Sequence, residues 1–151
     1  MRAYIKVARQ LKIGRMGENV KFRDLEITIE TDKGSYRYWK DKRTGKTGKT
    51  LMRYPYGYIK KTTGMDSEAI DCFVGPNEKA FSVYVIMTNR PPDFKRPDEQ
   101  KCMLGFDSSR DAKAAFQLHY DDPGFFRDII PIPYKEFKEK VFKQTKIAHA
   151  R

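Results

Sequence analysis

The sequence contains little of the cysteine and histidine on which zinc-binding and disulfide-rich proteins depend. In 151 residues there are two cysteines, two histidines and one tryptophan. No Cys-x-x-Cys spacing occurs, so a zinc site built from cysteine and histidine is not expected. Cys72 and Cys102 both stand within apolar runs, which predicts small buried side chains rather than a disulfide.

Long apolar runs are also missing. No stretch approaches the roughly 20 residues that a membrane helix needs, and residues 1–6 lack the apolar core of a signal peptide. We therefore expect no membrane partner and a reducing, cytoplasmic setting. A chain of this length fits one domain, which buries about 68–70% of its unfolded surface without disulfides or a structural metal.

The basic character of the chain is confined to its first part. The formal net charge is +11, and residues 1–65 contain 17 Lys and Arg against 6 Asp and Glu. Residues 66–151 contain 14 of each sign, so the whole excess precedes Asp66. Such asymmetry points to an anionic partner, either nucleic acid or a compact phosphate substrate, although a solvated basic surface has the same composition.

Hydrophobic periodicity predicts a strand-rich first part. Residues 25–31 alternate apolar and polar side chains, and residues 35–39 return after an Asp-Lys-Gly turn, which together predict a hairpin. Residues 40–50 are expected to form a basic loop. Further strands are expected at 70–74, 81–87 and 101–106.

The last third changes to a helical pattern. Ser108 resembles the N-cap of a helix whose apolar side chains recur to His119, and Asp122-Pro123-Gly124 ends it. A second helix is expected from Pro133, with an apolar stripe of Tyr134, Phe137 and Val141. The expected fold class is therefore α+β, a small β-barrel followed by two C-terminal helices.

One tempting motif is rejected. Gly45-Lys46-Thr47 and Gly48-Lys49-Thr50 each resemble the end of a phosphate-binding Walker A loop. That loop needs a glycine five residues earlier, where this chain has Lys40 and Arg43. No helix is expected to follow, so no helix N-terminus would receive the phosphates.

Three carboxylates, Asp66, Glu68 and Asp71, fall within six residues at the start of an apolar strand. An aspartate there is costly to bury unless it is paired or bound to a metal. Clustered carboxylates supply the oxygen ligands that Mg²⁺ or Mn²⁺ prefers, while a loop that caps and solvates itself is the alternative.

Cations and phenols surround this acidic cluster in the sequence. Tyr54-Pro55-Tyr56-Gly57-Tyr58-Ile59 precedes it, and Asp98-Glu99-Gln100-Lys101 follows it. Phosphate oxygens could accept charge-assisted hydrogen bonds from four basic side chains, namely Arg37, Arg53, Lys60 and Lys101. Carboxylates for a metal, cations and phenols are the groups that a polyphosphate hydrolase needs.

The tyrosine-rich run followed by Asp-x-Glu-x-Ile-Asp resembles the signature of the soluble family I inorganic pyrophosphatases. Closer still is the compact pyrophosphatase-like domain of phages and mobile elements. The similarity covers roughly residues 20–142 and extends through residues 34–37, 64–66, 74–76, 99–106 and 123–125.

This resemblance implies a small pyrophosphatase-like, OB-like β-barrel and a set of site residues. It implies three metal ligands, Asp66, Asp71 and Glu99, with Asp71 bridging two Mg²⁺ ions, or Mn²⁺ in their place. Glu68 would orient or deprotonate the attacking water, and Glu30 would be an outer-shell carboxylate. Phosphate would be bound by Arg37, Arg53, Tyr56 and Lys101, with Tyr56 also counted among the catalytic residues beside Glu68 and Asp71.

Two positions depart from the family pattern. Glu68 stands where an aspartate is usual, and a displacement of about 1 Å at such a position can cost about a hundredfold in rate. The compact domains usually carry an aspartate after the strand at 81–87, where this chain has Met87-Thr88-Asn89. Asp93 and Asp98 are the candidates to replace it.

The leading hypothesis is metal-dependent hydrolysis of pyrophosphate, or of a nucleotide phosphoanhydride, by a metal-activated water. The domain is expected to span residues 20–146, with residues 1–19 as a basic extension, either an added strand or an arm. The alternative is a nucleic-acid-binding or phage-associated protein that uses its basic N-terminal half on a catalytically degenerate scaffold. A non-catalytic assembly role is a third possibility, and the sequence indicates no oligomeric state.

Overall fold

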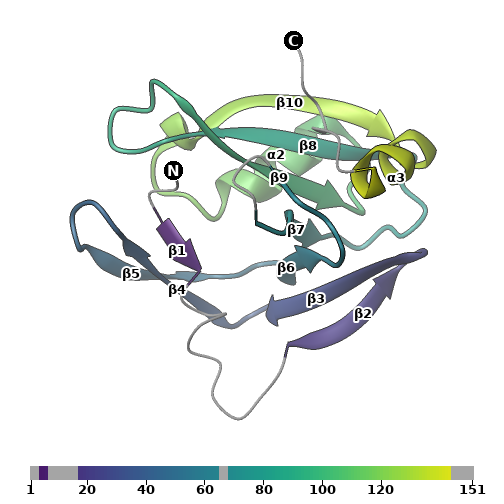
Figure 1. Ribbon diagram of the computed structural model, residues 1–151, viewed down its shortest axis with the longest axis horizontal. Helices are drawn as coiled ribbons and strands as arrows, with labels where there is room; N and C mark the ends of the chain where they lie inside the picture. The colour runs from purple at the N-terminus through teal and green to yellow at the C-terminus, as the bar shows by residue number, and fades with distance from the viewer. Residues whose placement is uncertain (1–3, 7–16, 65–67, 144–151) are drawn as a thin grey trace.

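The computed structural model describes residues 4–6, 17–64 and 68–143, which form a large and a small β-sheet with two α-helices (Figure 1). The larger sheet has seven strands in the order β10-β8-β9-β7-β6-β3-β2, and the smaller has the order β1-β4-β5. Strands β7 and β9 pair in parallel, and the other paired strands in the described chain are antiparallel. The chain is therefore α+β, as expected.

The elements are bounded as follows. The strands are β1 (Tyr4–Lys6), β2 (Glu18–Phe22), β3 (Leu25–Thr31), β4 (Tyr36–Asp41), β5 (Thr47–Leu51), β6 (Tyr56–Ile59), β7 (Asp71–Val74), β8 (Ser82–Asn89), β9 (Pro97–Leu104) and β10 (Phe126–Pro133). The helices are α2 (Ser109–Gln117), the short 3₁₀ helix η1 (Pro123–Phe125) and α3 (Tyr134–Phe142). None of the helices in the described ranges is long and apolar enough to cross a membrane.

Most of the expected elements are confirmed. Strands lie at β3, β7, β8 and β9, close to the ranges that periodicity indicated. The side chain of Ser108 caps α2 by accepting a hydrogen bond from the Asp111 amide at 3.1 Å. Cys72 and Cys102 are buried free thiols.

The expected barrel is wrong, because the large sheet is open. Strands β10 and β2 stand at opposite ends of the strand order and do not pair with each other within the described chain. The sheet instead covers its apolar faces with helices. One cluster, with Ile27, Val85 and Leu104, packs against Phe137 of α3, and the other packs against Phe116 of α2.

The expected hairpin of residues 25–31 with 35–39 is also wrong. Strand β3 pairs with β2 and β6, whereas β4 pairs with β1 and β5. Gly34, with a φ of +87°, turns the chain away, and its amide bonds to the Met52 carbonyl at 2.7 Å. Strand β3 instead has a partner strand on each side, and its Leu25, Ile27 and Thr28 are buried.

Residues 40–50, expected as a loop, are largely strand. Strand β5 pairs with β4 along Thr47–Leu51, and the connection is a short turn in which the Gly45 amide bonds to the Asp41 carbonyl at 2.8 Å. The rejection of a Walker A loop agrees with this geometry, because a strand and not a helix contains Gly48-Lys49-Thr50.

Candidate functional site

Three adjacent strands bring Tyr56, Asp71 and Lys101 into one buried group, called here the central triad. Strand β7 pairs with β6 on one side and with β9 on the other, and Asp71 stands opposite Lys101 in the parallel register. The Lys101 Nζ lies 2.9 Å from Asp71 Oδ2 and donates to the Tyr56 hydroxyl at 2.6 Å. The Tyr56 hydroxyl donates to the same carboxylate oxygen at 3.0 Å.

The burial of the triad fixes its charges. Asp71 is 1% and Lys101 2% exposed, so each charge requires the other. Burial lowers the pKa of the Lys101 ammonium, but Asp71 and Glu99 outweigh that effect and raise the pKa well above its usual value. Burial, together with the Asp71 charge, raises the pKa of the Tyr56 phenol well above its usual value. Lys101 therefore stays cationic and Tyr56 stays protonated at neutral pH.

Glu99 extends the triad along β9. One of its carboxylate oxygens, Oε1, lies 3.4 Å from the Lys101 Nζ, and the residue is 8% exposed. Its backbone is held by Thr88, whose hydroxyl donates to the Glu99 carbonyl and accepts from the Glu99 amide, both at 3.0 Å. Two of the three expected metal ligands thus face the same ammonium.

The oxygen donors of Asp71 and Glu99 suit a hard divalent cation in chemical type. Within residues 4–6, 17–64 and 68–143, no group of three or more His, Cys, Asp or Glu side chains has the arrangement of a metal site. Asp66, the third expected ligand, lies outside the described residues.

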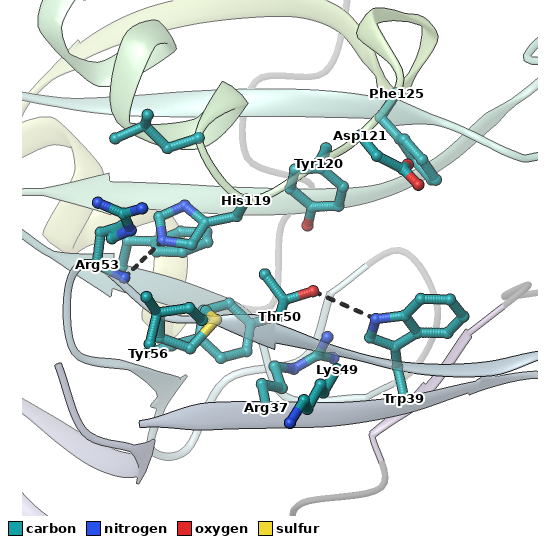
Figure 2. A pocket seen from close by; sticks show the side chains of 14 residues that line it. Arg37, Trp39, Lys49, Thr50, Arg53, Tyr56, His119, Tyr120, Asp121 and Phe125 are labelled. Atoms are coloured by element: carbon teal, nitrogen blue, oxygen red, sulfur yellow. Dashed lines mark hydrogen bonds between the residues drawn. The ribbon is translucent and has the colours of Figure 1, made fainter. Parts of the chain in front are cut away.

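A pocket of about 350 Å³ opens next to the triad and shares Tyr56 with it (Figure 2). Its walls come from β4 and β5 on one side and from the segment after α2 on the other. Three of the expected phosphate-binding residues line it, namely Arg37, Arg53 and Tyr56. The pocket therefore brings side chains of β4 and β5 together with those of the segment after α2, and Tyr56 connects it to the central triad.

The two arginines are held differently. The Arg37 guanidinium lies 4.9 Å from the centroid of the Tyr56 ring. Burial lowers the pKa of the Arg37 guanidinium. The nearby Tyr56 and Tyr120, together with the carboxylates of Asp71 and Glu99, outweigh this effect and raise the Arg37 pKa. Arg53 is exposed, and its backbone amide donates to His119 Nε2 at 2.9 Å. Arg37 is thus a fixed cation, and Arg53 has a fixed backbone with a solvated side chain.

The remaining expected residues lie apart from this pocket. Glu30 is half-buried at the β-bulge of β3, and Glu68 is exposed, with its carbonyl accepting from the Gly64 amide at 2.7 Å. Both belong to the described chain, and neither lines the pocket. Their expected roles stay predictions.

The segment where the family aspartate was expected has a structural role here. Asn89, 9% exposed, donates to the Gly124 carbonyl at 2.9 Å and accepts from Arg127 at 2.9 Å, which fastens β8 to η1 and β10. Asp93 is exposed in a turn, where it accepts from the Lys95 amide at 3.2 Å. Asp98 is half-buried on β9.

The pocket residues that sequence reasoning missed include Trp39, His119 and Tyr120. Trp39 stands two positions after Arg37 on β4, and the alternation of a strand places both on one face, so this signal was available. Tyr120 is half-buried, and burial is the main cause that raises the pKa of its phenol. His119 was assigned only to the apolar stripe of α2.

Comparison with known proteins agrees with the resemblance seen in the sequence. A family model described as Inorganic Pyrophosphatase matches residues 9–142. The inorganic pyrophosphatase of Corynebacterium glutamicum is 37% identical over 83 residues, which are 50% of this chain and 52% of that protein. The chain thus spans about half the length of the curated relative that it matches.

Proposed function

The chain belongs to the inorganic pyrophosphatase family, and we propose that it hydrolyses the phosphoanhydride bond of pyrophosphate or of a related compound. The observation that carries the proposal is the central triad of Tyr56, Asp71 and Lys101 beneath a pocket lined by Arg37 and Arg53. It combines a buried carboxylate with fixed cations, which are the groups needed to activate water and to stabilise phosphate charge.

The reaction adds one water across the P–O–P bond, so that P₂O₇⁴⁻ and H₂O give two HPO₄²⁻. The water oxygen bonds to one phosphorus, and the bridging oxygen leaves with the electron pair of the broken bond. In this proposal Asp71 accepts one proton of the attacking water and returns it to the leaving phosphate, which becomes the second HPO₄²⁻. Arg37 and Arg53 hold the phosphate oxygens, and Lys101, cationic at neutral pH, stabilises the developing charge.

The residues fit a divalent cation in donor type, and Mg²⁺ or Mn²⁺ would be held by Asp71 and Glu99 together with Asp66. A cation so bound supplies charge neutralisation and a more acidic water. Metal dependence is therefore part of the proposal, and a chelator is expected to abolish phosphate release.

Replacing Asp71 with Asn tests the assignment. The change keeps the side-chain shape but removes the carboxylate, and general-base catalysis typically contributes about 10²–10⁴-fold. We expect phosphate release from pyrophosphate in Mg²⁺ to fall by at least that factor. Asp111→Asn, an exposed aspartate in the first turn of α2, makes the same charge change as a control. Undiminished turnover in a folded Asp71→Asn protein would contradict the assignment.

A second candidate function is the binding of single-stranded nucleic acid. The face of β4 that points away from the pocket carries Tyr36 and Tyr38, which are 47% and 51% exposed, with Lys40 beside them. The ammonium of Lys49 lies 4.3 Å from the centroid of the Tyr36 ring. Exposed aromatic rings among cations are typical of surfaces on which bases stack.

Salt dependence tests this second function. If the phosphates of a labelled single-stranded oligonucleotide contact the lysines, log K should fall with log salt by about 0.7 per phosphate contacted. Tyr36→Ala should weaken binding further at constant salt, because one stacking ring is lost. Absence of binding at low salt, or binding insensitive to salt, would contradict the hypothesis.

A further inference from the structure

The pocket has an aromatic end that pyrophosphate does not use. Figure 2 shows Arg53 and His119 toward one end, and Trp39 facing the Asp121 and Phe125 region toward the other. Pyrophosphate consists of oxygens around two phosphorus atoms and offers no apolar surface to an indole or a phenyl ring. At about 350 Å³ the pocket also falls within the roughly 300–1,000 Å³ of pockets that take drug-sized ligands.

The indole of Trp39 is held in one orientation. Its Nε1 donates to the Thr50 hydroxyl at 3.2 Å on the neighbouring strand. Its cross-strand partner is Gly48, and a Cβ there would come within 2.4 Å of the ring atom Cζ2. The ring therefore packs directly against the glycine backbone, and it also lines the pocket. A rigid indole of this kind is suited to stacking a flat ligand.

The charged side chains of the pocket also differ between its two ends. Arg37 precedes Trp39 by two residues on β4, so a phosphate at Arg37 and a ring at Trp39 lie along the same face of the strand. The lining of the pocket includes an acidic residue, Asp121, which lies across from Trp39. A carboxylate there accepts N–H groups and repels phosphate, so it favours a base and not a second anion at this end.

We propose that the pocket takes a nucleoside 5′-phosphoanhydride, with the base stacked on Trp39, the phosphates on Arg37 and Arg53, and Asp121 accepting N–H groups of the base. Guanine is the preferred base, because its adjacent N1–H and N2 amino groups match the two oxygens of a carboxylate. The inference rests on the proposed function and names the substrate class of the same site. In GTP the added water again breaks one P–O–P bond, which yields GDP, phosphate and a proton.

Trp39 is the one tryptophan in the sequence, so its fluorescence reports directly on the base. We would titrate the whole chain in Mg²⁺ with β,γ-imido-GTP, β,γ-imido-ATP and imidodiphosphate, none of which is readily hydrolysed. The guanine nucleotide is expected to quench the emission and to bind more tightly than the adenine nucleotide and than imidodiphosphate. Equal affinity for imidodiphosphate and both nucleotides, or binding without quenching, would overturn the proposal.

Binding affinities of variants, measured by calorimetry, distinguish loss of base stacking from loss of the folded protein. Trp39→Leu and Gly48→Ala, the second of which forces the indole to shift, should each lower the preference for nucleotide over imidodiphosphate. For Trp39→Leu we expect the preference for nucleotide over imidodiphosphate to fall about 5- to 150-fold, the equivalent of roughly 1–3 kcal/mol of base stacking. Phe81→Leu, at an aromatic that is 79% exposed, is the matched control that should leave the preference unchanged. An unchanged preference in a folded Trp39→Leu protein would refute the proposal.

Failure of this inference differs from failure of the proposed function. Pyrophosphate turnover with no preference for nucleotides would leave the hydrolase in place and remove the nucleotide. Nucleotide binding that quenches Trp39, without phosphate release from any substrate, would keep the base site and remove the hydrolase.

Discussion

His119 joins α2 to the strands that form the pocket. Its Nε2 accepts the Arg53 amide at 2.9 Å, so its Nδ1 carries the proton and donates to the Ala115 carbonyl at 2.7 Å. The ring also lies 4.6 Å from that of Phe73. A neutral imidazole satisfies both hydrogen bonds, whereas a second proton on Nε2 would break the bond to Arg53.

This geometry predicts a loss of stability in mild acid. Burial is the main cause that lowers the pKa of His119 below its ordinary 6.5, and the Arg53 charge adds to it. Below pH 6.5 the unfolded chain binds a proton that the folded chain does not, so the free energy of unfolding falls as pH decreases toward the folded pKa. Urea midpoints at pH 7.5, 6.5 and 5.5 would measure this fall.

The matched variant is His119→Gln, which does not titrate. It should be less stable at pH 7.5, because the bond to Arg53 is altered, and its midpoint should change less between pH 7.5 and 5.5. If the variant shows the same pH dependence as the parent chain, another group is responsible.

At the same residue scale, part of the site follows from the sequence. Asp71 is costly to bury alone, and that fact pointed to a paired or metal-bound role before any partner was known. Its actual partner, Lys101, is 30 residues away, and the pairing depends on β7 and β9 being parallel neighbours. Periodicity indicates which residues share a face but not which strands adjoin, so the sequence did not predict this contact.

At the scale of elements, the sequence identified strands well where they are apolar and poorly where they lie at an edge. Strand β10 was missed because Pro131 and Pro133 interrupt it. Proline is tolerated there because β10 is an edge strand, where some amides need no partner. Strand β5 was taken for a loop because it is short, contains Gly48, and exposes Thr47 and Lys49 to solvent.

The mistaken hairpin shows why adjacency in sequence was insufficient. Residues 32–34 have the composition of a turn, and they do turn the chain, but into a different sheet. Gly57 on β6 explains part of the outcome, since a Cβ there would lie 1.8 Å from the Thr28 carbonyl oxygen. The close approach of β6 to β3 gives β3 a partner that a local pattern cannot reveal.

At the scale of the whole molecule, the large sheet separates two apolar clusters. Alternate residues of β8 divide between them, with Val83 and Val85 on the side of α3 and Tyr84 and Ile86 on the side of α2. Phe73 and Tyr56 belong to the cluster of α2, which also carries the pocket. The side of α3 therefore contributes stability without contacting the site.

Two alanine substitutions should distinguish these sides. Phe137 of α3 is 0% exposed and Phe73 of β7 is 1% exposed, and loss of a buried phenylalanine costs about 3–5 kcal/mol. That is a large share of the roughly 5–15 kcal/mol of an ordinary domain, so both variants should unfold at lower urea concentrations. Activity should differ between them, because the Phe73 ring lies 4.7 Å from that of Tyr56 and lines the pocket.

We expect Phe137→Ala to keep its turnover per folded molecule at low temperature. Phe73→Ala should lose turnover at least tenfold, because Tyr56 loses the ring that positions its hydroxyl toward Asp71 and Lys101. Phosphate release measured well below each unfolding midpoint, with the folded fraction taken from circular dichroism, makes the comparison. Equal losses in the two variants would mean that the sheet transmits disturbance from one side to the other, and that the site depends on both apolar clusters.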